Sequence, residues 1–287
     1  MAEAGDATGV NLTEQEKRDA ESRKHPRAQV LYEAIRIEGE HELGRPAAAL
    51  AWSGLAAGLS MGFSLVAMGL ASAALPEAPW AKLIVSLGYS VGFLIVIIAR
   101  QQLFTENTLT PVIPLLHNHD RTTFGRVLRL WAIVLSTNLI GTCAFAFVVQ
   151  RAQVFSPEVQ QAFGRLARHA LLGGFGSHLL RALFSGWLIA LMTWMLAGTD
   201  ARVFVIILIT LLIGMADLSH IVAGSSEAFY ALFSGGAAIQ EVFVSFLLPV
   251  GLGNVLGGTA LVALLNYAQV ASDEAGTESP PGGSNEH

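Results

Sequence analysis

Six long apolar segments constrain the fold of this chain more than any other feature of its sequence. A helix needs roughly 20 apolar residues to cross a bilayer core about 30 Å thick. The segments cover residues 49–75, 83–116, 125–149, 171–197, 203–233 and 240–270. Only 14% of the 287 residues are charged, whereas an average soluble domain has about 25%. The sequence therefore predicts an all-α membrane protein with six transmembrane helices.

Polar segments flank the apolar region at both ends. Residues 1–48 are predicted to form a cytoplasmic N-terminal segment that is partly helical, because residues 30–37 carry apolar side chains at helical spacing. Residues 271–287 contain several Pro, Gly and Ser and are predicted to form a disordered tail. The membrane domain is therefore expected to span residues 49–270.

The distribution of Lys and Arg predicts the orientation of the spans. Seven of the seventeen basic residues lie within residues 1–45, and Arg121, Arg126 and Arg129 lie in a loop on the same predicted side. The loop 151–168 on the opposite side is also basic and weakens the bias. We expect both termini in the cytoplasm.

Polar residues interrupt two of the six spans. The second span contains the charged and amide side chains of residues 99–108, and the fifth contains the acids and the histidine of residues 216–227. A charged group at bilayer depth costs about 2.5 kcal/mol or more unless it faces protein or water. Unwound backbone is tolerated where it lines a cavity. We therefore predict broken helices; the alternative is two loops, which would leave most half-spans too short to cross.

The two interruptions lie at corresponding places in the chain. Each is in the middle span of three, and the third spans share an Asn-x-x-Gly pattern that begins at Asn138 and Asn254. Two halves with three spans each enter the membrane in opposite senses, because three is odd. The sequence therefore predicts two inverted three-helix repeats, about 49–149 and 171–270, whose broken helices face each other near the midplane.

Three motifs in and after the predicted breaks resemble those of a known family. Leu103-Phe104-Thr105 resembles a loop that breaks the second span, and His220 with the three residues after it resembles a central histidine motif. Residues 248–258 resemble a sixth-span signature, the most specific of the three. Together they resemble the formate/nitrite transporter family over about residues 45–270.

The resemblance implies both an assembly and a class of substrate. It implies an aquaporin-like fold and a homo-oligomer, a pentamer in which each protomer has its own pore in the bilayer. It also implies passage of formate, nitrite, hydrosulfide, lactate or related monovalent species.

The chain departs from the usual pattern of that family beside both breaks. Arg100, Gln101 and Gln102 precede the Leu-Phe-Thr loop, where small residues and an acid are usual. Gly224 stands where an asparagine is common, and Gly174 falls where some members carry a lysine. The chain therefore resembles a divergent branch found in the bacterial inner membrane, and its fold is a better-supported expectation than its substrate.

His220 and Thr105 are the expected centre of the pore. Of the eight histidines, we assign only His220 to the interior of a span. It could donate a hydrogen bond to an anion or pass it a proton, or it could be a packed side chain bonded to a freed carbonyl. Thr105 offers a hydroxyl donor, although such a threonine often bonds to its own preceding turn. Free N–H groups at the half-helix ends would also attract an anion.

The other polar and apolar residues beside the breaks each have two possible roles. Leu103 and Phe104 could form an apolar constriction or pack in the core. Arg100 could be a fixed cation, or could pair with an acid of the breaks between protomers. Asp217 could orient the imidazole or cap a helix. The predicted acid partners of Arg100 are Glu106 and Glu227, and the predicted substrate path comprises His220, Thr105, Leu103, Phe104, Asn138, Asn254, Arg100, Glu106 and Asp217.

Other classes of membrane protein fit the sequence less well. Water and glycerol channels carry Asn-Pro-Ala at each break, and neither break has this motif. A proton-coupled transporter of another small solute stays open, because several residues beside the breaks are ionisable. An intramembrane enzyme would need a nucleophile with its base or several metal ligands, which the sequence does not indicate. We therefore predict a non-enzymatic channel or transporter for small monovalent anions or their conjugate weak acids, without cofactor, metal or nucleic-acid partner.

Overall fold

Helices make up the regular structure of this chain. The computed structural model describes residues 13, 15 and 27–277, and every regular element in this part of the chain is helical. Five helices are long and apolar enough to cross a membrane. They are α3 (Ala47–Ala74), α4 (Ala81–Ile98), α6 (Arg121–Arg151), α8 (Phe175–Ala197) and the segment Glu241–Gln269. The prediction of an all-α chain with several membrane-length helices is therefore confirmed.

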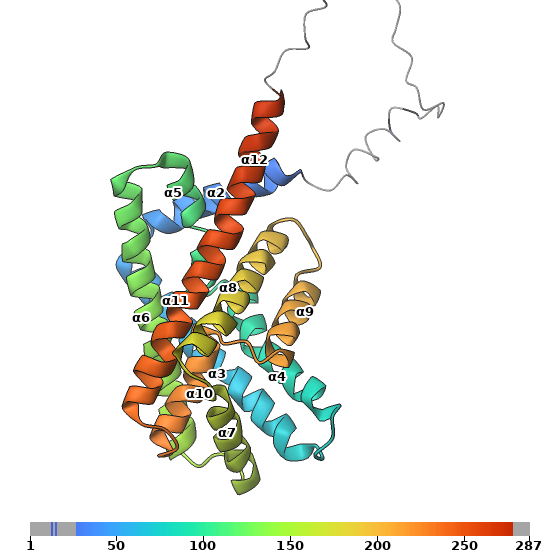
Figure 1. Ribbon diagram of the computed structural model, residues 1–287, viewed down its shortest axis with the longest axis vertical. Coiled ribbons are helices and arrows are strands. Elements are labelled where there is room, and N and C mark those ends of the chain that lie inside the picture. Colours follow the sequence, from blue (N-terminus) through green and yellow to red (C-terminus); the bar gives the residue numbers. More distant parts are fainter. Residues whose placement is uncertain (1–12, 14, 16–26, 278–287) are drawn as a thin grey trace, which may run out of the picture.

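The spanning helices run between two ends of the bundle that carry different short helices (Figure 1). At one end lie α2 (Ala28–Gly44) and α5 (Val112–Asn118), which pack against each other. At the other end lies α7 (Pro157–Ala170), which packs against α3. We call these the α2 end and the α7 end.

The last spanning segment is one helix with irregular stretches. It comprises η2 (Glu241–Leu247), α11 (Leu248–Leu256), η3 (Gly257–Ala263) and α12 (Leu264–Thr277). The bonding in η2 and η3 is of the π-helical type, which occurs mostly as single turns within α-helices, frequently at functional sites. In Figure 1, α12 extends beyond the rest of the bundle at the α2 end.

Helices end at both polar segments that the sequence singles out. After α4 ends at Ile98, the chain regains helical structure only at η1 (Glu106–Thr108) and then α5. In the second half, α9 (Arg202–Met215) and α10 (Ile221–Phe233) are separated by residues 216–220. The apolar helices α9 and α10 have 14 and 13 residues, so each is shorter than a span.

The helices before the two polar segments end in the same kind of turn. Arg100 and Asp217 each follow the C-cap and have left-handed φ angles of 54° and 51°. The next residue in each turn donates its N–H to the carbonyl five residues earlier, at 2.9 Å after α4 and 3.0 Å after α9. This Schellman pattern usually has glycine at the left-handed position. Two unrelated side chains thus occupy equivalent backbone positions.

Two parts of the fold differ from the sequence-based prediction. Residues 151–168 were expected to be a loop, but most of them lie in α7, whose apolar stripe includes the buried Ala162 and Phe163. The predicted tail begins at residue 271, whereas α12 remains helical to Thr277. Most of the predicted N-terminal segment before residue 27, and the tail after residue 277, lie outside the described residues.

Large apolar side chains cover much of the outer surface of the spanning helices. Trp52, Ile140 and Leu180 are 73%, 58% and 60% exposed. Such side chains do not belong on a surface that faces water over a large area. This surface suits contact with lipid chains or with another apolar protein surface.

Candidate functional site

His220 and Thr105 meet in the buried centre of the molecule. The Nε2 atom of His220 lies 2.8 Å from the Oγ1 atom of Thr105. The two side chains are 1% and 0% exposed. Thr105 belongs to the segment after α4, and His220 ends the segment between α9 and α10, so the bond joins the two polar segments directly.

The surroundings of the imidazole assign its tautomer. His220 is the N-cap of α10, and its Nδ1 accepts hydrogen bonds from the N–H groups of Val222 and Ala223 at 3.3 and 3.1 Å. An accepting nitrogen carries no hydrogen, so the ring is neutral and its hydrogen lies on Nε2. Nε2–H then donates to Thr105. The Thr105 hydroxyl keeps its own hydrogen, for which the described residues provide no other hydrogen-bonded partner.

Asn138 of α6 holds the first polar segment in place. Its Oδ1 accepts from the N–H of Phe104 at 2.9 Å. Its Nδ2 donates to the carbonyls of Gln102 at 2.9 Å and Gly54 at 2.8 Å. One buried carboxamide therefore satisfies backbone groups of a segment that lies outside regular helix.

Asn254 of α11 holds the second polar segment in the same way. Its Oδ1 accepts from the N–H of Ile221 at 2.8 Å, and its Nδ2 donates to the carbonyls of Ser219 at 3.3 Å and Ala182 at 2.8 Å. In both halves the amide bonds a backbone N–H, the carbonyl two residues earlier, and a carbonyl of the half's first spanning helix. The Asn-x-x-Gly pattern seen in the sequence thus reflects equivalent contacts.

Matching glycines allow each asparagine helix to approach its neighbour. A Cβ on Gly58 of α3 would collide with the backbone carbonyl of Asn138, and a Cβ on Gly186 of α8 would collide with that of Asn254. Neither backbone oxygen can move away without disturbing its helix. Small residues at these two positions are therefore required for the asparagine contacts.

Apolar side chains surround His220 and Thr105, which we call the central pair. The ring of Phe93 stands edge-on to the imidazole, with centroids 4.9 Å apart. Leu103 and Phe104 are buried, and the ring of Phe104 lies 6.1 Å from that of Trp131. This burial fits both roles that the sequence allows for Leu103 and Phe104, a constriction and core packing.

Two cavities approach the central pair from opposite ends. The α2-end cavity has about 330 Å³ and is lined by residues that include Arg100, Gln102, Leu103 and Glu106. The α7-end cavity has about 320 Å³ and is lined by residues that include His220. Thr105 lines neither cavity, so the bonded pair lies between them in a closed centre.

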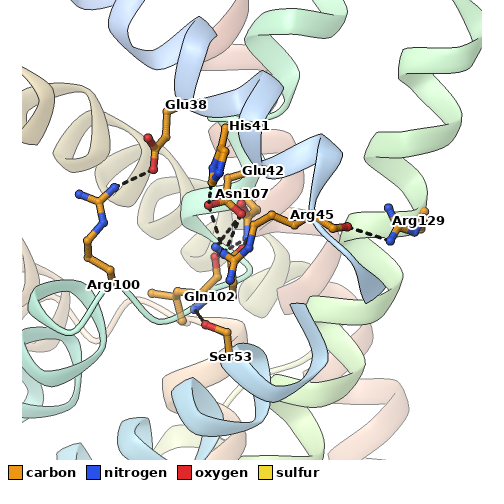
Figure 2. Close-up of polar contacts among 10 residues, drawn as sticks. Glu38, His41, Glu42, Arg45, Ser53, Arg100, Gln102, Asn107 and Arg129 are labelled. Carbon is orange, nitrogen blue, oxygen red and sulfur yellow. Dashed lines mark hydrogen bonds and ion pairs between the residues drawn. The ribbon is translucent and has the colours of Figure 1, made fainter. Parts of the chain in front are cut away.

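A polar network joins α2 to the segment after α4 (Figure 2). The carboxylate of Glu42 accepts from the side chains of Arg45 at 3.0 Å and Gln102 at 2.9 Å. Gln102 in turn accepts from Asn107 at 2.9 Å, and its backbone N–H donates to Ser53 at 3.1 Å. Sequence spacing does not predict this network, because α2 and Gln102 are too far apart in the chain.

The structure assigns Arg100 and Asp217 other partners than the sequence suggested. Arg100 forms an ion pair with Glu38 of α2 at 2.7 Å (Figure 2), and neither Glu106 nor Glu227 is its partner within this chain. Asp217 pairs with the side chains of Lys82 at 2.7 Å and His169 at 3.2 Å.

Asp217 therefore has neither of the roles expected for it. It makes no hydrogen bond to the imidazole, and His220 itself caps α10. The two predicted acid partners of Arg100 lie at opposite ends, where Glu106 lines the α2-end cavity and Glu227 lines the α7-end cavity.

The expectation of free N–H groups at the start of α10 is wrong. The N–H of Ile221 donates to Asn254, those of Val222 and Ala223 donate to the imidazole, and that of Gly224 donates to the carbonyl of His220. Side chains and the helix itself thus satisfy the first turn. An anion in the centre would have to bind side chains instead.

His178 is a second buried histidine that the sequence analysis missed. It lies on α8, inside the predicted span 171–197, and is 0% exposed. Its Nδ1 lies 3.4 Å from the hydroxyl of Ser219, and its ring packs edge-on against Phe246. Its place near the start of an apolar segment was the available signal, so His220 is not the only histidine within a span.

Comparison with known proteins gives the chain its family. Residues 29–268 match the family model described as formate/nitrite transporter. The chain is 42% identical over 254 residues to the inner membrane protein YfdC of Escherichia coli K12, covering 88% of this chain and 82% of that protein. It is 26% identical over 222 residues to a probable formate transporter of Methanothermobacter thermautotrophicus, covering 71% and 80%.

A solved structure supports the same fold. A pentameric formate channel with formate bound superposes with a TM-score of 0.66 at 20% identity, covering 78% of this chain and 98% of that one. The match with the family model covers most of the chain, including both polar segments. This chain belongs to the formate/nitrite transporter family.

Proposed function

We propose that this chain forms a channel for formate or another small monovalent anion, or for its conjugate weak acid. The observation that carries the proposal is the buried bond between His220 and Thr105, which closes the centre between two cavities. Relatives named as formate transporters and channels support the substrate class. The substrate path would run from the α2-end cavity past this pair to the α7-end cavity.

The proposed architecture is two inverted three-helix repeats whose second helices are broken. Equivalent Schellman turns before the polar segments support it, with Arg100 matching Asp217. The contacts of Asn138 and Asn254 to equivalent backbone groups support it further. The helix α4 with the segment after it would form the second span, and α9 with α10 the fifth. Together with α3, α6, α8 and the segment Glu241–Gln269, this gives six spans.

The central pair can bind an anion without a fixed charge. The neutral imidazole orients the Thr105 hydroxyl, which keeps a hydrogen to donate. A formate oxygen that displaced Thr105 from Nε2 would receive the imidazole hydrogen bond instead. Attraction of this strength suits a channel, since a conducted ion must leave its site as readily as it enters.

The proposed assembly is a pentamer in the inner membrane with both termini in the cytoplasm. A pentameric solved neighbour supports the assembly, and a relative named as an inner membrane protein supports the membrane. The orientation of the termini rests on the distribution of Lys and Arg. The exposed apolar side chains of the spanning helices give such an assembly both lipid-facing and subunit-facing surface. Each protomer would contain its own pore.

Flux into proteoliposomes tests the proposal. Formate, nitrite, hydrosulfide, acetate and chloride would be compared at two pH values, with saturable formate or nitrite flux as the expected result. Flux of another solute that requires a proton gradient would favour a proton-coupled secondary transporter. Absence of flux for all five anions with the oligomer intact would reject the proposed substrate class.

Two substitutions test the central pair within that assay. His220→Asn keeps an oxygen that can cap α10 but cannot reach Thr105, and Thr105→Val removes the hydroxyl while keeping the shape. Each loses a hydrogen bond of about 1–1.5 kcal/mol to the passing anion, so we expect flux to fall roughly tenfold. Thr105→Ser is the control and should retain most flux. Wild-type flux in both variants would remove the pair from the mechanism.

A further inference from the structure

Glu227 lies on the same face of α10 as His220. Residues 220, 224 and 227 are spaced four and three apart, which places them on one side of a helix. All three line the α7-end cavity. Because a helical side chain leans toward the N-terminus of its helix, we expect the carboxyl of Glu227 on the side of its Cα that faces His220.

Gly224 gives the ring of Phe246 room to pack against α10 in this cavity. A Cβ at this position would come within 2.7 Å of Cζ of Phe246, whose ring lines the same cavity. Any side chain would therefore displace that ring. With glycine here, position 224 itself places no side chain between Glu227 and His220.

The carboxyl of Glu227 has no hydrogen-bonding or ionic partner among the residues that the structure describes. The basic side chains of Lys82, His169 and Arg181, which line the same cavity, have other partners. Lys82 of α4 and His169 of α7 bind Asp217, and the guanidinium of Arg181 on α8 donates to the carbonyl of Leu172 at 3.1 Å. The remaining titratable groups that face the cavity are the hydroxyl of Tyr89 and the imidazole of His220.

The contacts of His220 limit its own use as a proton donor. To carry a second proton, the ring would have to protonate Nδ1, which accepts two backbone hydrogen bonds at the start of α10. Protonation would break both bonds and leave two buried N–H groups unpaired. The unpartnered carboxyl in the same cavity bears no such constraint.

We propose that Glu227 is a second functional residue of the transport path, which binds a proton and gives it to the anion in the α7-end cavity. In this step the O–H bond of the Glu227 carboxylic acid breaks and a new O–H bond forms on the anion, so that glutamate becomes a carboxylate and the anion a neutral acid. The carboxylate then regains a proton from water at the α7 end. This inference rests on the proposed function of the chain as a channel for weak-acid anions.

Formate flux through Glu227→Gln tests the step. At acidic pH the variant lacks the proton donor, and at neutral pH it lacks the negative charge that repels an incoming anion. Both effects lower the ratio of flux at acidic pH to flux at neutral pH. We expect this ratio to fall about tenfold, which is the change in the protonated-to-ionised ratio of one group per pH unit. Glu227→Asp keeps a carboxyl and should recover part of the ratio.

The matched control is Glu241→Gln. Glu241 is an exposed acid at the start of the last spanning segment, and it does not line the cavity. Its substitution should leave the flux ratio unchanged. A wild-type ratio in Glu227→Gln, or an equal loss of flux at both pH values with the oligomer intact, would overturn the proposal.

Infrared difference titration separates this proposal from the proposed substrate class. The purified wild-type oligomer should show a protonated-carboxyl absorption that Glu227→Gln lacks and Glu241→Gln retains. If the wild type transports none of the five anions, the proposed function fails, and this absorption still shows whether Glu227 binds a proton. Persistence of the absorption in Glu227→Gln would overturn the assignment whatever the flux.

Discussion

At the residue scale, the imidazole of His220 has both of its nitrogens committed. Nδ1 caps the start of α10, and Nε2–H binds Thr105. One side chain is therefore both a helix cap and part of the candidate site. Removing the ring therefore affects folding and transport together. A substitution that retains the cap, such as asparagine, is needed to separate the two effects.

The two acids of α2 that contact the segment after α4 should contribute unequally to its docking. Glu38 and Arg100 are 46% and 67% exposed at their side chains, so their ion pair should contribute about 0–1 kcal/mol. Glu42 is buried, and Glu42→Ala would leave the amide of Gln102 without its acceptor, which costs about 1–3 kcal/mol. Hydrogen exchange of the α2 amides should therefore accelerate much more in Glu42→Ala than in Glu38→Ala. Equal acceleration would contradict this ranking.

Sequence patterns identified the residues of the central pair, but not the partners of Arg100 and Asp217 beside it. The motif that contains Thr105 and the one that contains His220 are local in sequence, so both were visible without a structure. The partners of Arg100 and Asp217 come from helices 48 or more positions away, and no spacing rule relates such residues. Asp217 was expected to act on His220 because of helical spacing, but its left-handed φ ends the helix before that spacing applies.

At the scale of elements, Asn138 and Asn254 should have similar costs when they are replaced. Asn138→Leu and Asn254→Leu each remove a carboxamide that bonds one backbone N–H and at least two carbonyls in a buried site. We expect each variant to lose about 2–4 kcal/mol of stability. Unfolding of the purified protein in detergent would measure both.

A neighbouring substitution provides the control for these two variants. Thr137 bonds only carbonyls of its own preceding turn, so Thr137→Val should change stability by much less. A large cost for Asn138→Leu together with a negligible cost for Asn254→Leu would mean that the two segments are not held equivalently. That result would count against the proposed repeat.

The helices of the bundle differ in how clearly the sequence predicts them. Long apolar segments located α3, α4, α6 and α8 to within a few residues, because a span is a strong and continuous signal. The helix α7 was missed, since its charged residues hide an apolar stripe that only helical spacing shows. The end of α12 was also missed, because composition alone does not show where a terminal helix stops.

At the scale of the whole molecule, the two ends differ in their charged contacts. At the α2 end, acids of α2 hold the segment after α4 through an ion pair and an amide network. At the α7 end, Asp217 binds the side chains of Lys82 and His169, and Glu227 has no partner among the described residues. The fold is nearly symmetric at the centre, whereas the two cavities are chemically different. A solute would therefore meet different groups depending on the side from which it enters.

The predicted orientation places the α2 end in the cytoplasm. Arg36, Arg45 and Arg129 lie at the α2 end, and the long basic loop that weakened the sequence argument is largely the helix α7 at the other end. Basic residues near the ends of spans favour the cytoplasmic side. In a background in which Cys143 is replaced by serine, a cysteine at Asp120 should react with a membrane-impermeant maleimide only in inverted vesicles.

A cysteine at Ser156, at the start of α7, is the matched position at the opposite end. It should react only in intact cells or right-side-out vesicles. In the proposed fold the chain starts in the cytoplasm, and three spans lie between α2 and α7. Reaction of both positions from one side would require an even number of crossings between them. That outcome would contradict α6 as a span and, with it, the opposite insertion of the two halves on which the proposed pore depends.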